Sequence, residues 1–306
     1  MFWLISCFLF LGITYCFYWV AFYNPESRHQ EPAPILRSQN RIQEETMNRE
    51  LANLPFEAVC ITSKDGLTLR GRYYHIQDGA CLHIQFHGYR GNGVRDLSAI
   101  HHVTRELGYN TLIVEQRAHG QSQGNTMTFG VKERWDCVQW AKYAHDRFGS
   151  ETPVFLSGVS MGAATVLMSS ALPLPENVAG IIADCAYSSP AAVIRKICRD
   201  IHIPGFLAVP FGTAAALIWG RFWLFGASSV KAVQCAKVPV LLIHGTEDKY
   251  IPPDMSRQIQ ANCGAQCFLE LFPGAAHGGS CLTDTPRYKR VMENFVNFCL
   301  NTKRER

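Results

Sequence analysis

Short apolar runs alternate with longer amphipathic segments over most of the chain. The stretch "EAVCITSKDGLTLRGRYYHI" is typical of a β-hairpin that turns at Asp65-Gly66. Later runs are typical of short buried strands, namely "CLHIQFHG", "NTLIVEQ", "VFLSGV", "VAGIIADCA", "VPVLLIHG" and "CFLELFPG". Segments with helical spacing lie among them, including "GVRDLSAIHHVTREL", "VKERWDCVQWAKYAHDRF" and "TPRYKRVMENFVNFCL". This alternation predicts an α/β fold with a mostly parallel central sheet and helices on both faces.

The first residues follow a different pattern. From Phe2 to Tyr23 the chain has no charged residue, and as a helix this stretch would be about 33 Å long, enough to span a bilayer core. A cleaved signal peptide is the alternative, but no Lys or Arg precedes the apolar run and no small-residue cleavage site follows it. We expect a retained single-pass membrane anchor. The basic residues after it, Arg28, Arg37 and Arg41, predict a cytoplasmic main domain.

The composition divides the chain into three parts. Residues 1–23 form the predicted transmembrane anchor, residues 24–54 a linker, and residues 55–306 the main domain. Within the domain, residues 187–233 are too many for an ordinary loop, and we expect them to form an inserted helical lid. A protein that lacks the residues up to about Ser27 should keep its activity, because every candidate catalytic residue comes later in the chain.

Charge and cysteine content narrow the classes of function. The 306 residues carry a net charge of +4 without a basic block, so nucleic acid is not an expected partner. The 12 cysteines show no repeated paired spacing. Cys263 and Cys267 lack a second Cys or His pair at ligand spacing, so we expect no metal ion and no other cofactor. The sequence does not indicate an oligomeric state.

One serine stands in a pattern that needs explanation. "GVSMG", from Gly158 to Gly162, follows a predicted strand and precedes a predicted helix. A sharp strand-to-helix turn strains the central residue, and glycines two positions before and after it relieve the collisions. Ser160 would then lie at a helix N-terminus, where developing negative charge is stabilised. Because glycine and serine are common, this pattern identifies a nucleophile only if its partners are present.

A serine nucleophile needs a base, and the base needs an orienting acid. Asp248 follows the predicted strand "VPVLLIHG", and His277 follows the predicted strand "CFLELFPG". Both residues come just after a strand in the chain order Ser, Asp, His that this architecture requires. Glu247 is the rival acid, which we interpret as a solvated loop carboxylate. His244 lies within a strand end and is expected to fill a packing or supporting role.

An acyl-transfer site also needs donors for the oxyanion. The loop "HGYRGN" follows a predicted strand and opens a helix, so its backbone N–H groups can face Ser160. We predict that the backbone N–H groups of Tyr89 and Met161 form the oxyanion hole.

These motifs together resemble the α/β-hydrolase superfamily, over roughly Phe56 to Leu300, and more narrowly its membrane-anchored bacterial serine hydrolases with a short helical lid. The motifs are "HGYRGN", "GVSMG", "HGTEDKYIPP" and "PGAAHGG". The resemblance implies the α/β-hydrolase fold, with Ser160 as nucleophile, Asp248 as acid and His277 as base. The loop "EQRAHGQS" departs from the family pattern D-x-R-G-H-G-x-S, with Glu115 for the aspartate and Ala118 for the first glycine.

The expected function is that of a carboxylesterase or lipase-like hydrolase, which cleaves carboxylic esters or thioesters through an acyl-enzyme. A serine peptidase or amidase, an acyltransferase and an inactive binding protein on the same scaffold are the alternatives. The predicted lid is apolar, which favours a small-molecule substrate with an acyl chain or aromatic group. We expect Phe206, Leu207 and Trp219 to contact that substrate.

Overall fold

The computed structural model describes residues 2–25 and 41–304. Its core is a sheet whose strands are β1 (Glu57–Thr62), β2 (Thr68–Tyr74), β3 (Leu82–Phe86), β4 (Asn110–Val114), β5 (Val154–Val159), β6 (Val178–Asp184), β7 (Val240–Gly245) and β8 (Cys267–Phe272). The strands β3 to β7 are buried at every position, as a sheet covered on both faces requires. The short apolar runs of the sequence are these strands.

The sheet has eight strands in the order β1-β2-β4-β3-β5-β6-β7-β8. β2 pairs antiparallel with both β1 and β4, and every other pairing is parallel. The predicted hairpin is formed by β1 and β2, with Gly66 at a positive φ of 86° in its turn. The predicted mostly parallel sheet is therefore confirmed, and the carboxyl ends of β3, β5, β7 and β8 meet along one edge.

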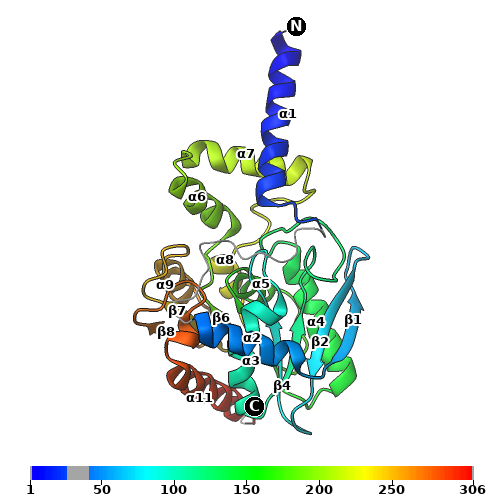
Figure 1. Ribbon diagram of the computed structural model, residues 1–306, viewed down its shortest axis with the longest axis vertical. Coiled ribbons are helices and arrows are strands. Elements are labelled where there is room, and N and C mark those ends of the chain that lie inside the picture. Colours follow the sequence, from blue (N-terminus) through cyan, green and yellow to red (C-terminus); the bar gives the residue numbers. More distant parts are fainter. Residues whose placement is uncertain (1, 26–40, 305–306) are drawn as a thin grey trace.

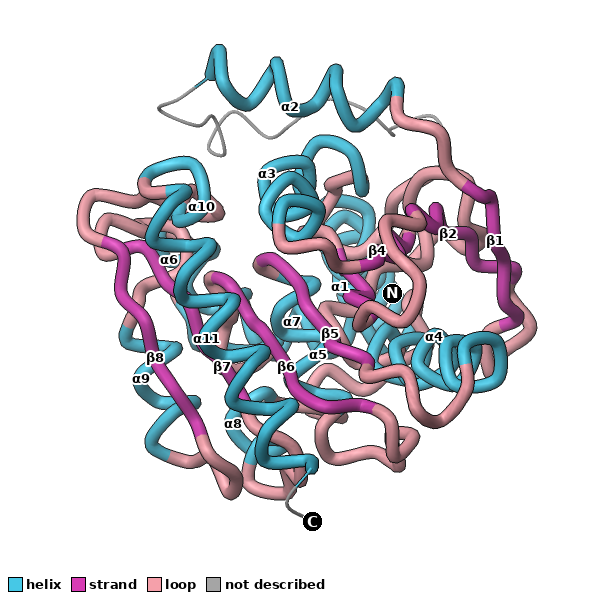
Figure 2. Tube along the Cα trace, turned by 90° about the horizontal axis from the view of Figure 1, so that it is seen from below, coloured by secondary structure: helices cyan, strands magenta, loops and turns pink. Residues whose placement is uncertain are grey.

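Helices cover both faces of the sheet (Figure 2). One face carries α3 (Gly93–Glu106) and α11 (Thr285–Arg304), whose apolar side chains Leu97, Ile100, Met292 and Phe295 join one buried cluster. The opposite face carries α4 (Glu133–Phe148), α5 (Met161–Ser169), α8 (Ser229–Val233) and α9 (Asp254–Ala261), which form a second cluster with the strands. The short helix α10 (Ser280–Thr283) precedes α11. The prediction that helices cover both faces of the sheet is thus confirmed.

The N-terminal helix α1 (Phe2–Ala21) projects from one end of the molecule, and the C-terminus lies toward the other end (Figure 1). Among the described residues it is the one helix long and apolar enough to cross a membrane, a test that a signal sequence also passes. Residues 26–40 of the predicted linker lie outside the described residues. The rest of that linker forms α2 (Arg41–Asn53), which packs on the domain, because Leu51 is buried and Asn48 accepts a hydrogen bond from Ser98.

The segment between β6 and β7 is helical. It contains α6 (Pro190–Asp200), α7 (Gly205–Ile218) and α8. Ser189 caps α6 by accepting a hydrogen bond from the N–H of Ala192, and Pro190 occupies the first turn, so the start of this segment is specified locally. Figure 1 shows α6 and α7 at the same end of the molecule as α1.

Candidate active site

Ser160 occupies the sharp turn between β5 and α5. Its φ of 54° and ψ of −111° lie outside the regions that non-glycine residues favour. The flanking glycines make this turn sterically feasible. A Cβ on Gly158 would lie 2.4 Å from the carbonyl carbon of Gly162, and a Cβ on Gly162 would lie 2.0 Å from the Phe86 oxygen. The local sequence therefore positions the Ser160 hydroxyl at the start of a buried helix.

His277 lies in the loop after β8 and contacts both partners that the sequence predicts. Its Nε2 is 2.9 Å from Ser160 Oγ, and its Nδ1 is 2.7 Å from Asp248 Oδ2. A carboxylate can only accept, so the Nδ1 of a neutral His277 carries the proton and donates it to Asp248. The Nε2 lone pair then faces the serine hydroxyl, which is the tautomer that a general base requires.

Asp248 is fixed by its own loop after β7. Its Oδ1 accepts hydrogen bonds from the N–H groups of Tyr250 at 3.0 Å and Ile251 at 2.8 Å. Burial alone would raise its pKa, but hydrogen bonds from His244 and His277 outweigh burial and hold the pKa of Asp248 at about 2. Asp248 is thus an ionised, buried carboxylate, whereas the rival acid Glu247 is exposed to solvent.

His244 contacts Asp248, and of the packing or supporting role that the sequence suggested for it the structure shows a supporting one. Its Nε2 donates to the carbonyl oxygen of Ile251 at 2.8 Å and lies 3.3 Å from Asp248 Oδ2. Its Nδ1 accepts from the hydroxyl of Ser256 at 2.7 Å. One tautomer of His244 therefore bonds both the Ile251 carbonyl oxygen and the Ser256 hydroxyl while it orients the Asp248 carboxylate. The position of His244 near the carboxyl end of β7, four residues before Asp248, was the available signal for this role.

The loop before α3 lies against the serine. A Cβ on Gly88 would be 3.6 Å from Ser160 Cβ, and Tyr89 is the next residue. Met161 is the first residue of α5, and the first N–H groups of a helix have no acceptor within that helix. The backbone near Ser160 thus offers N–H groups from the two segments that the sequence predicted. The roles of Tyr89 and Met161 remain proposals.

Comparisons with known proteins agree with this architecture. A family model described as the alpha/beta hydrolase fold matches residues 84–201. The esterase Pf2001 of Pyrococcus furiosus superposes with a TM-score of 0.66 at 19% identity, over 92% of this chain and 98% of that chain. The chain is an α/β hydrolase by fold. Est1E of Butyrivibrio proteoclasticus, solved with ferulic acid bound, superposes with a TM-score of 0.60 at 21% identity, over 78% of this chain and 99% of that chain.

Curated proteins that match by sequence are also distant relatives. YqkD of Bacillus subtilis, an uncharacterized protein, is 23% identical over 241 residues, which are 78% of this chain and 79% of its own length. The α/β-hydrolase fold that the sequence motifs predicted is therefore confirmed, and its structural relatives include esterases.

The loop after β4 carries the departures from the motif pattern of the superfamily that the sequence resembles. Ala118, in place of a glycine, has a left-handed φ of 60°, which costs a non-glycine residue roughly 1–2 kcal/mol. Its carbonyl oxygen accepts a hydrogen bond of 2.7 Å from the Asn24 amide. Glu115, in place of an aspartate, accepts from the N–H of Gln121 at 2.6 Å. Contacts from the loop itself and from the N-terminal segment thus hold the strained turn.

The predicted lid residues lie on and just after α7. Phe206 is 76% exposed, and Leu207 is 41% exposed. Trp219 contacts the N-terminal helix, because its Nε1 donates to Thr14 Oγ1 at 3.2 Å and its ring meets Tyr15 edge-on at 5.0 Å. The structure thus brings together Ser160, Asp248, His277 and the Tyr89 loop, while Phe206 and Trp219 are directed to solvent and to α1. A substrate-binding role for these lid residues stays a prediction.

One cluster near the serine resembles a metal site in composition. Ligand atoms of Cys185, Asp248 and His277 lie within 4.8 Å of one another. This donor set fits a metal ion poorly, because His277 Nδ1 and Asp248 Oδ2 are already hydrogen-bonded to each other. A structural zinc site would also need a fourth ligand. We therefore interpret the cluster as part of the serine site.

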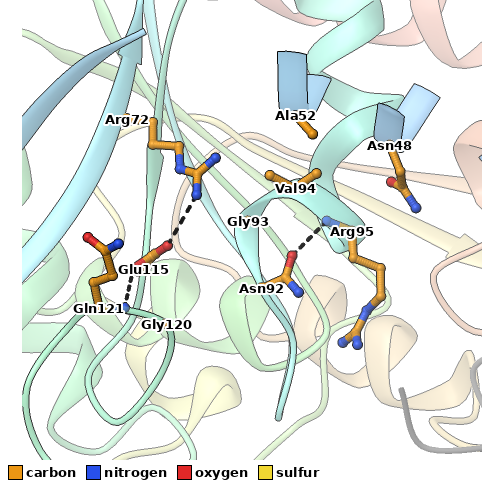
Figure 3. Close-up of a pocket in the computed structure, with 10 residues that line it drawn as sticks. All are labelled: Asn48, Ala52, Arg72, Asn92, Gly93, Val94, Arg95, Glu115, Gly120 and Gln121. Atoms are coloured by element: carbon orange, nitrogen blue, oxygen red, sulfur yellow. Dashed lines mark hydrogen bonds and ion pairs between the residues drawn. The ribbon is translucent and has the colours of Figure 1, made fainter. Parts of the chain in front are cut away.

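A separate cavity of about 630 Å³ lies between α2, the start of α3 and the loop after β4 (Figure 3). Arg72 and Glu115 face each other across it at 3.9 Å, and Asn92 accepts from the N–H of Arg95 at 2.9 Å. The residues that line it are Asn48, Ala52, Arg72, Asn92, Gly93, Val94, Arg95, Glu115, Gly120 and Gln121. Since Ser160 is not among them, we do not assign the reaction to this cavity.

Proposed function

We propose that the protein is a serine hydrolase that cleaves carboxylic esters or thioesters through an acyl-enzyme. The observation that carries this proposal is the series of two hydrogen bonds, 2.9 Å between Ser160 Oγ and His277 Nε2 and 2.7 Å between His277 Nδ1 and Asp248 Oδ2. These are the distances at which a base can take a serine proton while an acid orients the base.

In the proposed reaction, Ser160 Oγ attacks the carbonyl carbon and His277 Nε2 takes the hydroxyl proton. The oxyanion accepts hydrogen bonds from the N–H groups of Tyr89 and Met161, and Asp248 stabilises the imidazolium. The tetrahedral intermediate expels the alcohol or thiol, which leaves with the proton from His277. Water then attacks the acyl-enzyme, gives a proton to His277, and releases the acid as the proton returns to Ser160.

Esters rank above amides for this site. The resemblance to the esterase Pf2001 supports an ester substrate. A panel of p-nitrophenyl esters beside aminoacyl anilides compares the two substrate classes. Faster turnover of the anilides would make the protein an amidase or peptidase, and transfer of the acyl group to an added alcohol in preference to water would make it an acyltransferase.

The test of the nucleophile is Ser160→Ala. Turnover of p-nitrophenyl esters should fall on the order of 10⁴-fold or more, because no other group in the proposed mechanism attacks the carbonyl. A fluorophosphonate probe should label the native protein and not this variant. Ser170→Ala is the matched control, because Ser170 is a buried serine at the other end of α5 and should leave labelling intact. Equal labelling of native protein and Ser160→Ala would overturn the proposal.

The acid and base are tested separately. His277→Ala should cost about as much as Ser160→Ala, and Asp248→Asn should cost the same or less. The double variants should not be additive, because the three residues act as a unit. If Glu247→Gln abolished turnover while Asp248→Asn did not, Asp248 would be the wrong acid.

A further inference from the structure

The C-terminal half of α1 and the residue that follows it, Phe22, are packed into the main domain. Phe22 is fully buried, and its ring meets those of Phe129 and Phe222 edge-on at 5.7 and 5.2 Å. The Tyr18 hydroxyl lies 2.7 Å from Thr126 Oγ1. A segment removed as a signal sequence would not contribute buried side chains to the folded domain. These contacts fit a helix that the protein retains.

The lid helix α7 lies directly against α1. Phe211 meets Phe10 at 5.8 Å between ring centroids, and a Cβ on Gly212 would be 3.0 Å from the Phe17 ring. Farther along, Trp219 donates its hydrogen bond to Thr14. Neither helix contains a charged residue. The two helices therefore form one uncharged unit, which we call the α1–α7 pair (Figure 1).

The positions of these contacts along α1 determine how deep α7 would lie in a bilayer that α1 spans. They fall between Phe10 and Phe17, and Phe10 lies about 16 Å from Ala21 along a helix with a rise of 1.5 Å per residue. The hydrocarbon core of a bilayer is about 30 Å thick. If α1 enters a bilayer at the surface of the domain, α7 must therefore enter the adjacent leaflet with it.

The exposed side chains of the α1–α7 pair suit that environment. On α1, Phe2, Leu4, Phe8, Leu9 and Val20 are each at least 64% exposed. On α7 and the turns around it, the exposed apolar residues include Phe206, Leu217, Ile218, Trp223 and Phe225. Contiguous exposure of this kind is rare on proteins surrounded by water and marks a contact surface. The neighbouring helix α6 carries the exposed residues Arg195 and Arg199, which suit the level of lipid headgroups.

The α1–α7 pair also reaches the loop beside the serine. The Tyr89 hydroxyl donates to the carbonyl oxygen of Ala21 at 2.9 Å, and Arg90 Nη2 donates to that of Val20 at 2.7 Å. Gly88 of the same loop approaches Ser160. The end of α1 that would leave the bilayer is thus attached to the loop next to the nucleophile.

We propose that the α1–α7 pair is embedded together in a lipid bilayer, and that the substrates are acyl esters that reside in that bilayer. This inference rests on the proposed hydrolase function, because it gives that site its substrate class. The bilayer is the partner, and it both holds the pair and supplies esters whose acyl chains stay in hydrocarbon until they reach Ser160.

The depth of α7 is tested by fluorescence in proteoliposomes of phosphatidylcholine and phosphatidylglycerol. Full-length Leu217→Cys carries an NBD label, and Ile42→Cys is the matched control, because Ile42 is an 84% exposed apolar residue on α2. Both variants carry serine at the exposed native cysteines, which are Cys7, Cys16, Cys60 and Cys235.

Lipids with a doxyl group on the acyl chain should quench the label at Leu217 several-fold more than the label at Ile42. Equal and weak quenching at both positions would overturn the inference. So would a label at Leu217 that is shielded from both water and lipid, because a second copy of the chain would then cover α7.

The substrate class is tested with two esters. Leu217→Lys should lower hydrolysis of p-nitrophenyl palmitate in the same vesicles about tenfold, because a charge in α7 opposes its insertion. Hydrolysis of p-nitrophenyl acetate in water should not change, and Ile42→Lys should affect neither ester. Leu217→Lys with unchanged palmitate hydrolysis would overturn the inference alone, whereas Ser160→Ala that kept activity on both esters would overturn the hydrolase proposal itself.

Discussion

Replacing Phe22 by alanine tests whether the N-terminal helix is a separable anchor or part of the folded domain. The sequence favours a separable anchor, so that a protein lacking the residues up to about Ser27 would keep its activity. Ser27 itself lies outside the described residues, but the chain up to Asn24 is packed. Phe22 is fully buried among Phe17, Phe129 and Phe222, with ring centroids at 5.2 to 6.0 Å.

The size of the effect follows from this burial. Phe→Ala substitutions in protein cores cost about 3–5 kcal/mol, which combines lost transfer energy with the cavity that remains. We expect about 3 kcal/mol, the lower end of the range, because Phe22 lies close to the end of α1, where the chain can partly relax. For a domain of this size, such a change lowers the unfolding midpoint by roughly 6 °C.

The measurement is thermal unfolding of the full-length protein in detergent micelles, followed by circular dichroism. Phe8→Ala is the control, because Phe8 is a phenylalanine on α1 that is 74% exposed, and its unfolding midpoint should match that of the native protein. Turnover of p-nitrophenyl acetate should also fall for Phe22→Ala, since Phe129 stacks on Tyr89 at 5.1 Å. If Phe22→Ala and Phe8→Ala unfolded at the same temperature, the packing argument would be refuted.

Two further predictions concern charged groups near the serine site, Asp184 and Arg90. Burial raises the pKa of Asp184 to about 6, so the folded protein holds this proton more tightly than the unfolded chain, and the free energy of unfolding should fall as pH rises from about 4 to about 6. Asp184→Asn should remove up to ~3 kcal/mol of this dependence in denaturant titrations, and an unchanged pH profile would exclude Asp184 as its source. Arg90→Gln should lower kcat for p-nitrophenyl acetate by about tenfold with little change in KM, because it loosens the loop of the proposed oxyanion donor Tyr89. If Arg90→Gln lowered the unfolding midpoint as well as kcat, the role of Arg90 would instead be structural.

Local patterns were sufficient to predict the strands and the site loops. β3 to β7 are short apolar runs because both of their faces are covered, and a buried run can be recognised without its neighbours. Ser160 was predictable because its strained φ needs glycine at two defined positions. Asp248 and His277 were predictable because parallel strands deliver their following loops to one edge of the sheet.

Contacts between distant segments were not predictable in this way. The sequence of α7 is apolar all round, and this pattern does not show whether the helix covers a substrate or packs on another helix. Its contact with α1 joins Trp219 to Thr14, which are far apart in the chain. The orientation of His244 beside Asp248 likewise depends on the Ser256 hydroxyl from α9, a contact that the local pattern of apolar and polar residues does not predict.

The hydrogen bonds at the end of α1 couple the proposed anchor to the proposed chemistry. The last carbonyl groups of a helix have no partner within it and carry partial negative charge. The Arg90 guanidinium donates to two carbonyl oxygens here, those of Val20 at 2.7 Å and Tyr23 at 3.2 Å. Arg90 also donates its backbone N–H to His119 Nε2, and its neighbour Tyr89 bonds Ala21. Any change that displaces α1 removes the carbonyl acceptors of Val20, Ala21 and Tyr23 together, so the loop beside Ser160 should lose its order when the helix leaves its site.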